Sequence, residues 1–113
     1  MNYSIESKND LFIIRIHNHR ATIDFADRLK EELDVYINEK NLALGIIDIS
    51  KVEFIDSSML GVLVVGLKWT SMKGGDLKIV GLQPPVRAMF ELTKMYKVFE
   101  VYETIEDTLA SCE

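Results

Sequence analysis

The chain has 113 residues, 13 of them Lys or Arg and 18 Asp or Glu, which gives a formal net charge of −5. Because an acidic chain without a basic run is poorly suited to a phosphate backbone, we expect no direct nucleic-acid binding. The 48% hydrophobic and 27% charged residues are typical of a globular protein, and at this length we expect one domain over residues 1–113.

The N-terminal residues predict a β-hairpin. Apolar and polar residues alternate over residues 3–8, Asn9-Asp10 is a turn signal, and residues 11–16 are a largely apolar run rich in isoleucine. We therefore expect strands over 3–8 and 11–16. The polar residues 17–21 that follow predict a loop.

The next segment, residues 22–39, predicts an amphipathic helix of about four turns. Thr22 is suited to the N-cap, because its hydroxyl can accept a hydrogen bond from a first-turn N–H group. The apolar residues recur at helical spacing and should face the core; they are Ala26, Leu29, Leu33, Tyr36 and Ile37.

The middle of the chain predicts a strand–helix–strand unit. Residues 42–49 are a nearly continuous apolar run, which is typical of a buried central strand. Residues 51–55 are expected to connect it to a largely buried helix over 56–72, which Gly74-Gly75 should end before a strand over 77–80. Such a unit predicts two parallel strands joined by a right-handed crossover.

The C-terminal third predicts two more helices and one more strand. Pro84-Pro85 suit a helix start, because proline lacks an N–H group that would be unpaired there. Residues 98–102 predict the last strand, and Thr104 is suited to cap a final helix. The element order is ββαβαβαβα, so we expect an α/β (α+β) fold with an open sheet.

The triplet Asp56-Ser57-Ser58 is the most informative candidate site. Two hydroxyls and a carboxylate stand at the expected N-terminus of a buried helix, where unpaired N–H groups and the helix dipole favour negative charge. A phosphate on either serine would be tolerated there and would add about −1.5 to −2 charge. Ordinary helix capping is the simpler explanation of the same residues, and the pattern alone does not choose between Ser57 and Ser58.

The residues give little support to an enzyme or a metal site. A nucleophile elbow needs glycine two positions before and after the serine, and neither Ser57 nor Ser58 has these glycines. The two histidines, His17 and His19, share one polar loop and lack the spacing of a known metal motif. We therefore expect neither catalysis nor a bound metal.

No membrane or export segment is visible in the sequence. The most apolar stretch, residues 60–67, is far shorter than the roughly 20 residues that span a bilayer, and the N-terminus lacks the apolar core of a signal peptide. The single cysteine, Cys112, excludes an internal disulfide and suits a reducing compartment. We expect a cytoplasmic protein that does not bind membranes.

Four segments resemble the STAS domains of bacterial anti-sigma factor antagonists. Residues 47–61, IDISKVEFIDSSMLG, are similar to the family signature, in which an apolar strand ends in Asp-Leu/Ile-Ser and a loop carries Phe, a hydrophobic residue and Asp-Ser-Ser/Thr before a glycine-containing helix. Residues 73–80 resemble the glycine turn and the strand after it. Residues 83–93 resemble the next helix, and 99–111 the last strand and helix.

This resemblance implies an open mixed sheet of about five strands with about four helices, packed mainly on one face. It also implies a phospho-switch. Unphosphorylated members bind an anti-sigma factor, often itself a serine kinase, and so release a sigma factor for transcription. The kinase uses ATP to phosphorylate the first serine of the triplet, here Ser57, with Ser58 as the alternative. A separate serine phosphatase removes the phosphate.

The chain itself is then expected to need no cofactor. The resemblance implies a partner-binding surface that comprises Asp56, Ser57, Ser58, Met59, Asn18 and His19. An alternative function is that of a STAS subunit in a larger signalling scaffold, or of a regulator of another partner such as a transporter.

Two departures from the family pattern lie in this expected surface. Met59 stands where the family has a glycine after the second serine, and residues 18–22 replace the Gly-x-Leu-Asp motif before the first helix. The effect of Met59 on phosphorylation and the identity of the sigma factor, the kinase and the signal therefore stay open, as does the oligomeric state.

Overall fold

The fold is built on a mixed five-stranded sheet in the order β1-β2-β4-β6-β7, beside a two-stranded ribbon of β3 and β5. The computed structural model describes residues 2–112. The strands are β1 (Tyr3–Lys8), β2 (Leu11–Ile16), β3 (Arg20–Ala21), β4 (Leu44–Asp48), β5 (Phe54–Ile55), β6 (Asp76–Val80) and β7 (Val101–Tyr102). The α-helices are α1 (Ile23–Asp34), α2 (Ser57–Met72), α3 (Pro84–Leu92) and α4 (Ile105–Ser111). The expected α/β fold with an open mixed sheet is confirmed.

Strand pairing follows the sequence expectation in its main features. β1 and β2 form the antiparallel hairpin, with Tyr3 opposite Ile16 and Lys8 opposite Leu11. β4 pairs in parallel with both β2 and β6, so the strand–helix–strand unit around α2 does join parallel neighbours. β7 pairs in parallel with β6 at the other edge.

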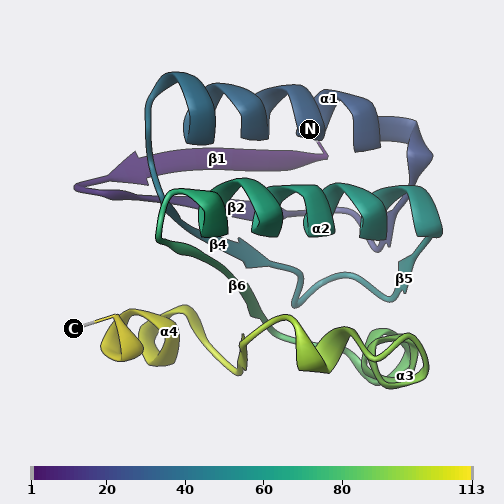
Figure 1. Ribbon diagram of the computed structural model, residues 1–113. Helices are drawn as coiled ribbons and strands as arrows, with labels where there is room; N and C mark the ends of the chain where they lie inside the picture. Colours follow the sequence, from purple (N-terminus) through teal and green to yellow (C-terminus); the bar gives the residue numbers. More distant parts are fainter. Residues whose placement is uncertain (1, 113) are drawn as a thin grey trace.

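The helices lie mainly on one face of the sheet. In Figure 1, α1 and α2 run side by side along the sheet, and α4 lies apart from them near the C-terminus. Alternate strand residues, such as Ile47 and Ile79, form the large core with α1, α2 and α3. Their neighbours in the strands, such as Ile46 and Val80, form a smaller cluster with Ile105 of α4 on the opposite face.

The first helix buries the predicted stripe. Ala26, Leu29, Leu33 and Ile37 are all at most 1% exposed. Thr22 caps the helix, because its hydroxyl oxygen accepts a hydrogen bond from the N–H of Asp24. After Asp34 the helix continues as a π-helical turn over Val35–Glu39.

Glycines end α2 and bring two loops together. Gly74 has a φ of +79°, which suits the turn after a helix because glycine has no side chain to clash there. A Cβ on Gly75 would stand 1.7 Å from the carbonyl oxygen of Ala43, so only glycine permits this approach. The predicted end of the helix at Gly74-Gly75 is therefore confirmed.

Three expectations were wrong in detail. The expected loop over 17–21 contains β3, and the expected connection over 51–55 contains β5. Residues 98–102 form a strand only at Val101–Tyr102, because a 3-10 turn over Met95–Lys97 precedes it. In that turn the carbonyl of Met95 accepts hydrogen bonds from the N–H groups of Val98 and Phe99.

Within residues 2–112, none of the helices is both long enough and apolar enough to cross a membrane.

Candidate functional site

The ribbon of β3 and β5 holds the loop before α1 against the loop before α2. The backbone carbonyl of His19 accepts hydrogen bonds from the N–H groups of Glu53 at 2.7 Å and Phe54 at 3.1 Å. The N–H of Asp56 donates to the carbonyl of Ala21 at 3.2 Å. Two segments more than thirty residues apart are thereby fixed side by side, immediately before their helices begin.

The carboxylate of Asp56 joins the N-termini of both helices. Its Oδ1 accepts a hydrogen bond of 2.9 Å from the N–H of Met59 and so caps α2. Its Oδ2 accepts one of 2.9 Å from the N–H of Ile23, the first residue of α1. One negative charge thus serves the positive ends of two helix dipoles. The sequence predicted the first contact and not the second.

The two serines of the triplet differ in their accessibility. Ser57 is the first residue of α2 and is exposed to solvent, whereas Ser58 is half-buried. Both stand in the first turn, where backbone N–H groups have no partner within the helix. Accessibility therefore favours Ser57 as the hydroxyl that another protein can reach.

Met59 lies beneath this surface. Its side chain is 0% exposed and belongs to the large core, and its N–H is bound by Asp56. The side chain at the position of the family glycine therefore packs inward, and in this structure it takes no part in the exposed surface.

The other two predicted partner-binding residues border the site. His19 is exposed, and its Nδ1 lies 3.3 Å from Oε2 of Glu53, the residue before β5. Asn18 is half-buried and donates from Nδ2 to Oδ1 of Asn2 at 3.0 Å. The structure thus brings His19 next to β5 and holds Asn18 against the N-terminal segment.

Exposed apolar side chains flank Ser57, and sequence reasoning missed them. Ile23 is 64% and Phe54 44% exposed, although both residue types are usually buried. The guanidinium carbon of Arg20 lies 4.3 Å from the centre of the Phe54 ring, a cation–π contact that holds this ring in place. We call these exposed residues, Arg20, Ile23, Phe54 and Ser57, the α2 N-terminal surface.

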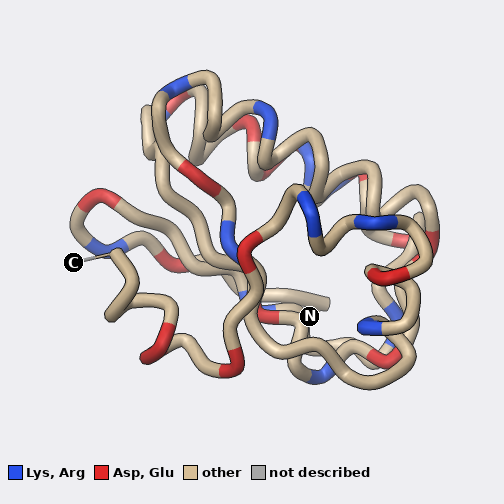
Figure 2. The backbone as a smooth tube through the Cα atoms, turned by 60° about the horizontal axis from the view of Figure 1, so that its bottom comes forward, with Lys and Arg blue, Asp and Glu red and all other residues tan. Residues whose placement is uncertain are grey.

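Charged residues of both signs are distributed along the chain around this surface. Figure 2 shows Lys and Arg interspersed with Asp and Glu along the described backbone. Among residues 2–112, no three His, Cys, Asp or Glu side chains are grouped so as to hold a metal ion. The chemistry the site offers is an exposed hydroxyl at the positive end of a helix, next to a carboxylate whose two oxygens are both engaged.

Comparison with known proteins identifies the family. The STAS domain profile matches residues 2–108. The chain is 24% identical over 118 residues to the anti-sigma F factor antagonist of Paenibacillus polymyxa, covering 100% of this chain and 97% of the relative. It is 31% identical over 109 residues to the anti-sigma-B factor antagonist of Listeria monocytogenes, covering 89% and 90%.

A solved structure shares the fold. The anti-sigma factor antagonist SpoIIAA in its unphosphorylated form superposes with a TM-score of 0.86 at 15% identity, covering 97% of this chain and 95% of that one. At this identity the likeness concerns the fold alone. The match to residues 2–108 and the 31% identity together show that the chain belongs to the STAS domain family.

Proposed function

We propose that this protein is an anti-sigma factor antagonist, which binds an anti-sigma factor through the α2 N-terminal surface while Ser57 carries no phosphate. The observation that carries the proposal is the exposed Ser57 hydroxyl at the start of α2, beside exposed Ile23 and Phe54. The names of the relatives support the class of partner.

Binding would draw on the exposed apolar side chains. Full burial of such a side chain contributes about 1.5–3 kcal/mol. Because Ile23 is 64% and Phe54 44% exposed, a partner that covers them would gain the corresponding part of that energy. The ribbon of β3 and β5 and the Asp56 carboxylate fix the backbone of this surface before a partner arrives. Such preorganisation lowers the entropy cost of association.

Phosphorylation of Ser57 would reverse this affinity while leaving the fold in place. The phosphate adds about −1.5 to −2 charge, which the positive end of α2 tolerates. The Asp56 carboxylate next to it already uses both oxygens to accept N–H groups, so the added charge stands beside a like charge. The phosphate would make the region around Ser57 more anionic, so that an acidic partner face would be repelled and an apolar one would have to desolvate the phosphate.

The remaining parts of the cycle lie in the partners. The anti-sigma factor, acting as a serine kinase, would use ATP to phosphorylate Ser57, and a serine phosphatase would restore the hydroxyl. Ser58, the less exposed hydroxyl, is the alternative acceptor. The protein would hold no cofactor of its own.

Affinity purification from cells of the source organism tests the proposal. Tagged Ser57→Ala should retain a kinase-type anti-sigma factor, because alanine cannot receive the phosphate that releases it, and Ser57→Asp should lose it. Ser71→Asp is the matched control, since it adds the same charge to an exposed serine near the other end of α2 and should leave binding intact. Retention of the partner by Ser57→Asp would contradict the proposal. Recovery of a large assembly without an anti-sigma factor would favour the scaffold function instead.

A further inference from the structure

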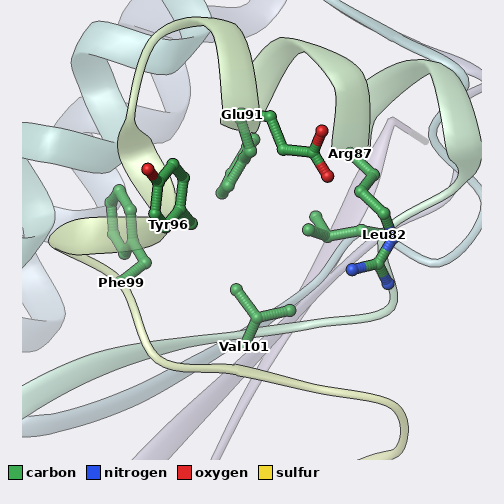
Figure 3. Close-up of a pocket in the computed structure, with 7 residues that line it drawn as sticks. Leu82, Arg87, Glu91, Tyr96, Phe99 and Val101 are labelled. Carbon is green, nitrogen blue, oxygen red and sulfur yellow. The ribbon is translucent and has the colours of Figure 1, made fainter.

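A cavity of about 570 Å³ lies between α3, the 3-10 turn and β7, and the proposed function does not use it. Figure 3 shows side chains from all three elements around it. Pockets that bind small molecules in proteins have volumes of about 300–1,000 Å³, so the size is suitable for such a ligand.

The floor of the cavity is apolar and already formed. Phe90 and Phe99 are 1% and 4% exposed, and their ring centres are 6.1 Å apart. Leu82 and Val101 are half-buried and complete the floor. Because these side chains belong to the core or pack against it, they need no rearrangement to receive an apolar group.

One wall of the cavity is a tyrosine held by an unusual turn. Lys94 has a φ of 61°, a left-handed conformation that reverses the chain after α3. The turn that follows places Tyr96 against the cavity with 52% of its surface exposed. Tyr96 and Phe99 therefore form an aromatic side of the cavity, seen on the left in Figure 3.

Opposite charges face the aromatic side. Arg87 and Glu91 are one turn apart on α3, a spacing at which such residues often pair. Within the described residues they form no ion pair with each other or with any other side chain. Figure 3 shows both charged groups on the side of the cavity away from Tyr96 and Phe99. The cavity thus offers one free cation and one free anion beyond an apolar floor.

We propose that this cavity binds a small zwitterion with an apolar body, of the class of the aromatic and aliphatic α-amino acids. The ligand carboxylate pairs with the guanidinium of Arg87, which can donate two parallel hydrogen bonds. The ligand ammonium pairs with the carboxylate of Glu91, and the apolar side chain lies between Tyr96 and Val101. A ligand with a single charge would leave one of the two charged residues unpaired.

α3, which forms one wall of the cavity, also packs against the segment that leads to Ser57. α3 packs against β5, and Nε2 of Gln83, at the start of α3, donates to the carbonyl of Ser50 at 2.7 Å. The binding proposal stands whether or not Ser57 is phosphorylated, so the two proposals fail independently.

Titration of the 15N-labelled protein followed by NMR tests the site. L-phenylalanine is the first probe, and L-leucine and L-tryptophan are further members of the class. We expect saturable shifts of the amide signals of Arg87, Glu91, Tyr96 and Val101, with a Kd below about 1 mM for at least one probe. 3-Phenylpropionate lacks the ammonium group and phenethylamine lacks the carboxylate, so each should bind at least about tenfold more weakly than L-phenylalanine.

Charge-removing variants assign the roles of the two charged residues. R87Q and E91Q should each weaken binding of the best probe at least about tenfold, while R87Q should leave binding of phenethylamine unchanged. K97Q removes an exposed positive charge from the 3-10 turn that does not line the cavity, and it should bind as the unmodified protein does. The NMR spectrum of each variant reports whether it is folded. The absence of saturable shifts with all three amino acids, or equal binding of the single-charge analogues, would overturn the proposal.

Discussion

Replacing Asp56 by alanine should destabilise the protein more than the loss of a single helix cap. The carboxylate accepts from the N–H of Met59 and from that of Ile23, both at 2.9 Å. Loss of an N-cap costs about 1 kcal/mol, and a hydrogen bond to a charged group contributes about 1.5–3 kcal/mol. Since the contact to Ile23 is exposed, its contribution belongs at the lower end of that range. The expected total is about 2–3 kcal/mol.

Urea unfolding followed by circular dichroism measures this loss. With a typical dependence of about 1–3 kcal/mol per molar urea, a loss of about 2–3 kcal/mol should lower the midpoint of Asp56→Ala by about 0.7–3 M. Asp56→Asn keeps one acceptor oxygen, but its NH2 group cannot accept the second N–H. Its stability should therefore lie between that of the unmodified protein and that of Asp56→Ala. Asp27→Ala, an exposed position of α1, is the matched control and should change stability by less than about 0.5 kcal/mol.

The relation between these variants is the decisive result. If Asp56→Ala and Asp27→Ala unfold at the same urea concentration, the carboxylate does not join the two helices and the account of this site is wrong. A loss of only about 1 kcal/mol for Asp56→Ala would show that capping of α2 is its sole structural role.

Three further predictions concern the rest of the fold. Tyr3→Phe should raise stability by about 1 kcal/mol, because the buried Tyr3 hydroxyl has no hydrogen-bond partner within residues 2–112. Burial raises the pKa of Tyr3 from 10.0 to about 12. The free energy of unfolding should therefore keep its full value below pH 10 and fall as the pH rises towards 12. Tyr3→Phe should not show this fall. Gly75→Ala should lower the thermal midpoint sharply, since its Cβ would stand 1.7 Å from the Ala43 carbonyl oxygen; an unchanged midpoint would refute this close approach. Lys78 is buried and donates to Glu100 at 2.9 Å. Urea unfolding should show that Glu100→Ala, which leaves the buried ammonium without this partner, costs about 1–2 kcal/mol, and that Lys78→Met costs little. Equal losses for the two variants would refute this.

The long periodic segments could be predicted from the sequence because their burial pattern is repeated over several turns or residues. The apolar stripe of α1 predicted which side of the helix faces the core. Its aliphatic members are all buried: Ala26, Leu29, Leu33 and Ile37. The apolar run of β4 likewise indicated a central strand with parallel neighbours. Local capping residues such as Thr22 marked helix starts correctly because the cap depends on the adjacent backbone alone.

The contacts that build the candidate site were not predictable in the same way. β3 and β5 have two residues each, which is too short for any periodic signal, and they pair across more than thirty residues of sequence. The hydrogen bond from Ile23 to Asp56 depends on that pairing. A sequence pattern indicates that Asp56 can cap a helix, but only the tertiary structure shows that it serves a second one.

The last strand shows how backbone geometry outweighs propensity. Residues 98–102 are rich in β-branched and aromatic types, which favour a strand. Lys94, in the left-handed conformation, starts the 3-10 turn. In that turn the carbonyl of Met95 accepts hydrogen bonds from the N–H groups of Val98 and Phe99. The register with β6 is therefore confined to Val101 and Tyr102, which lie opposite Ile79 and Val80.

The affinity of the anti-sigma factor for this protein before and after phosphorylation tests the central claim most directly. The partner recovered with Ser57→Ala serves as the ligand, mass spectrometry locates the phosphate, and isothermal titration calorimetry gives both dissociation constants. We predict that phosphate on Ser57 raises the Kd at least tenfold, which corresponds to about 1.4 kcal/mol, and that Ser58→Ala behaves as the unmodified protein does. Equal affinity of the two forms, with the phosphate located on Ser57, would contradict the account.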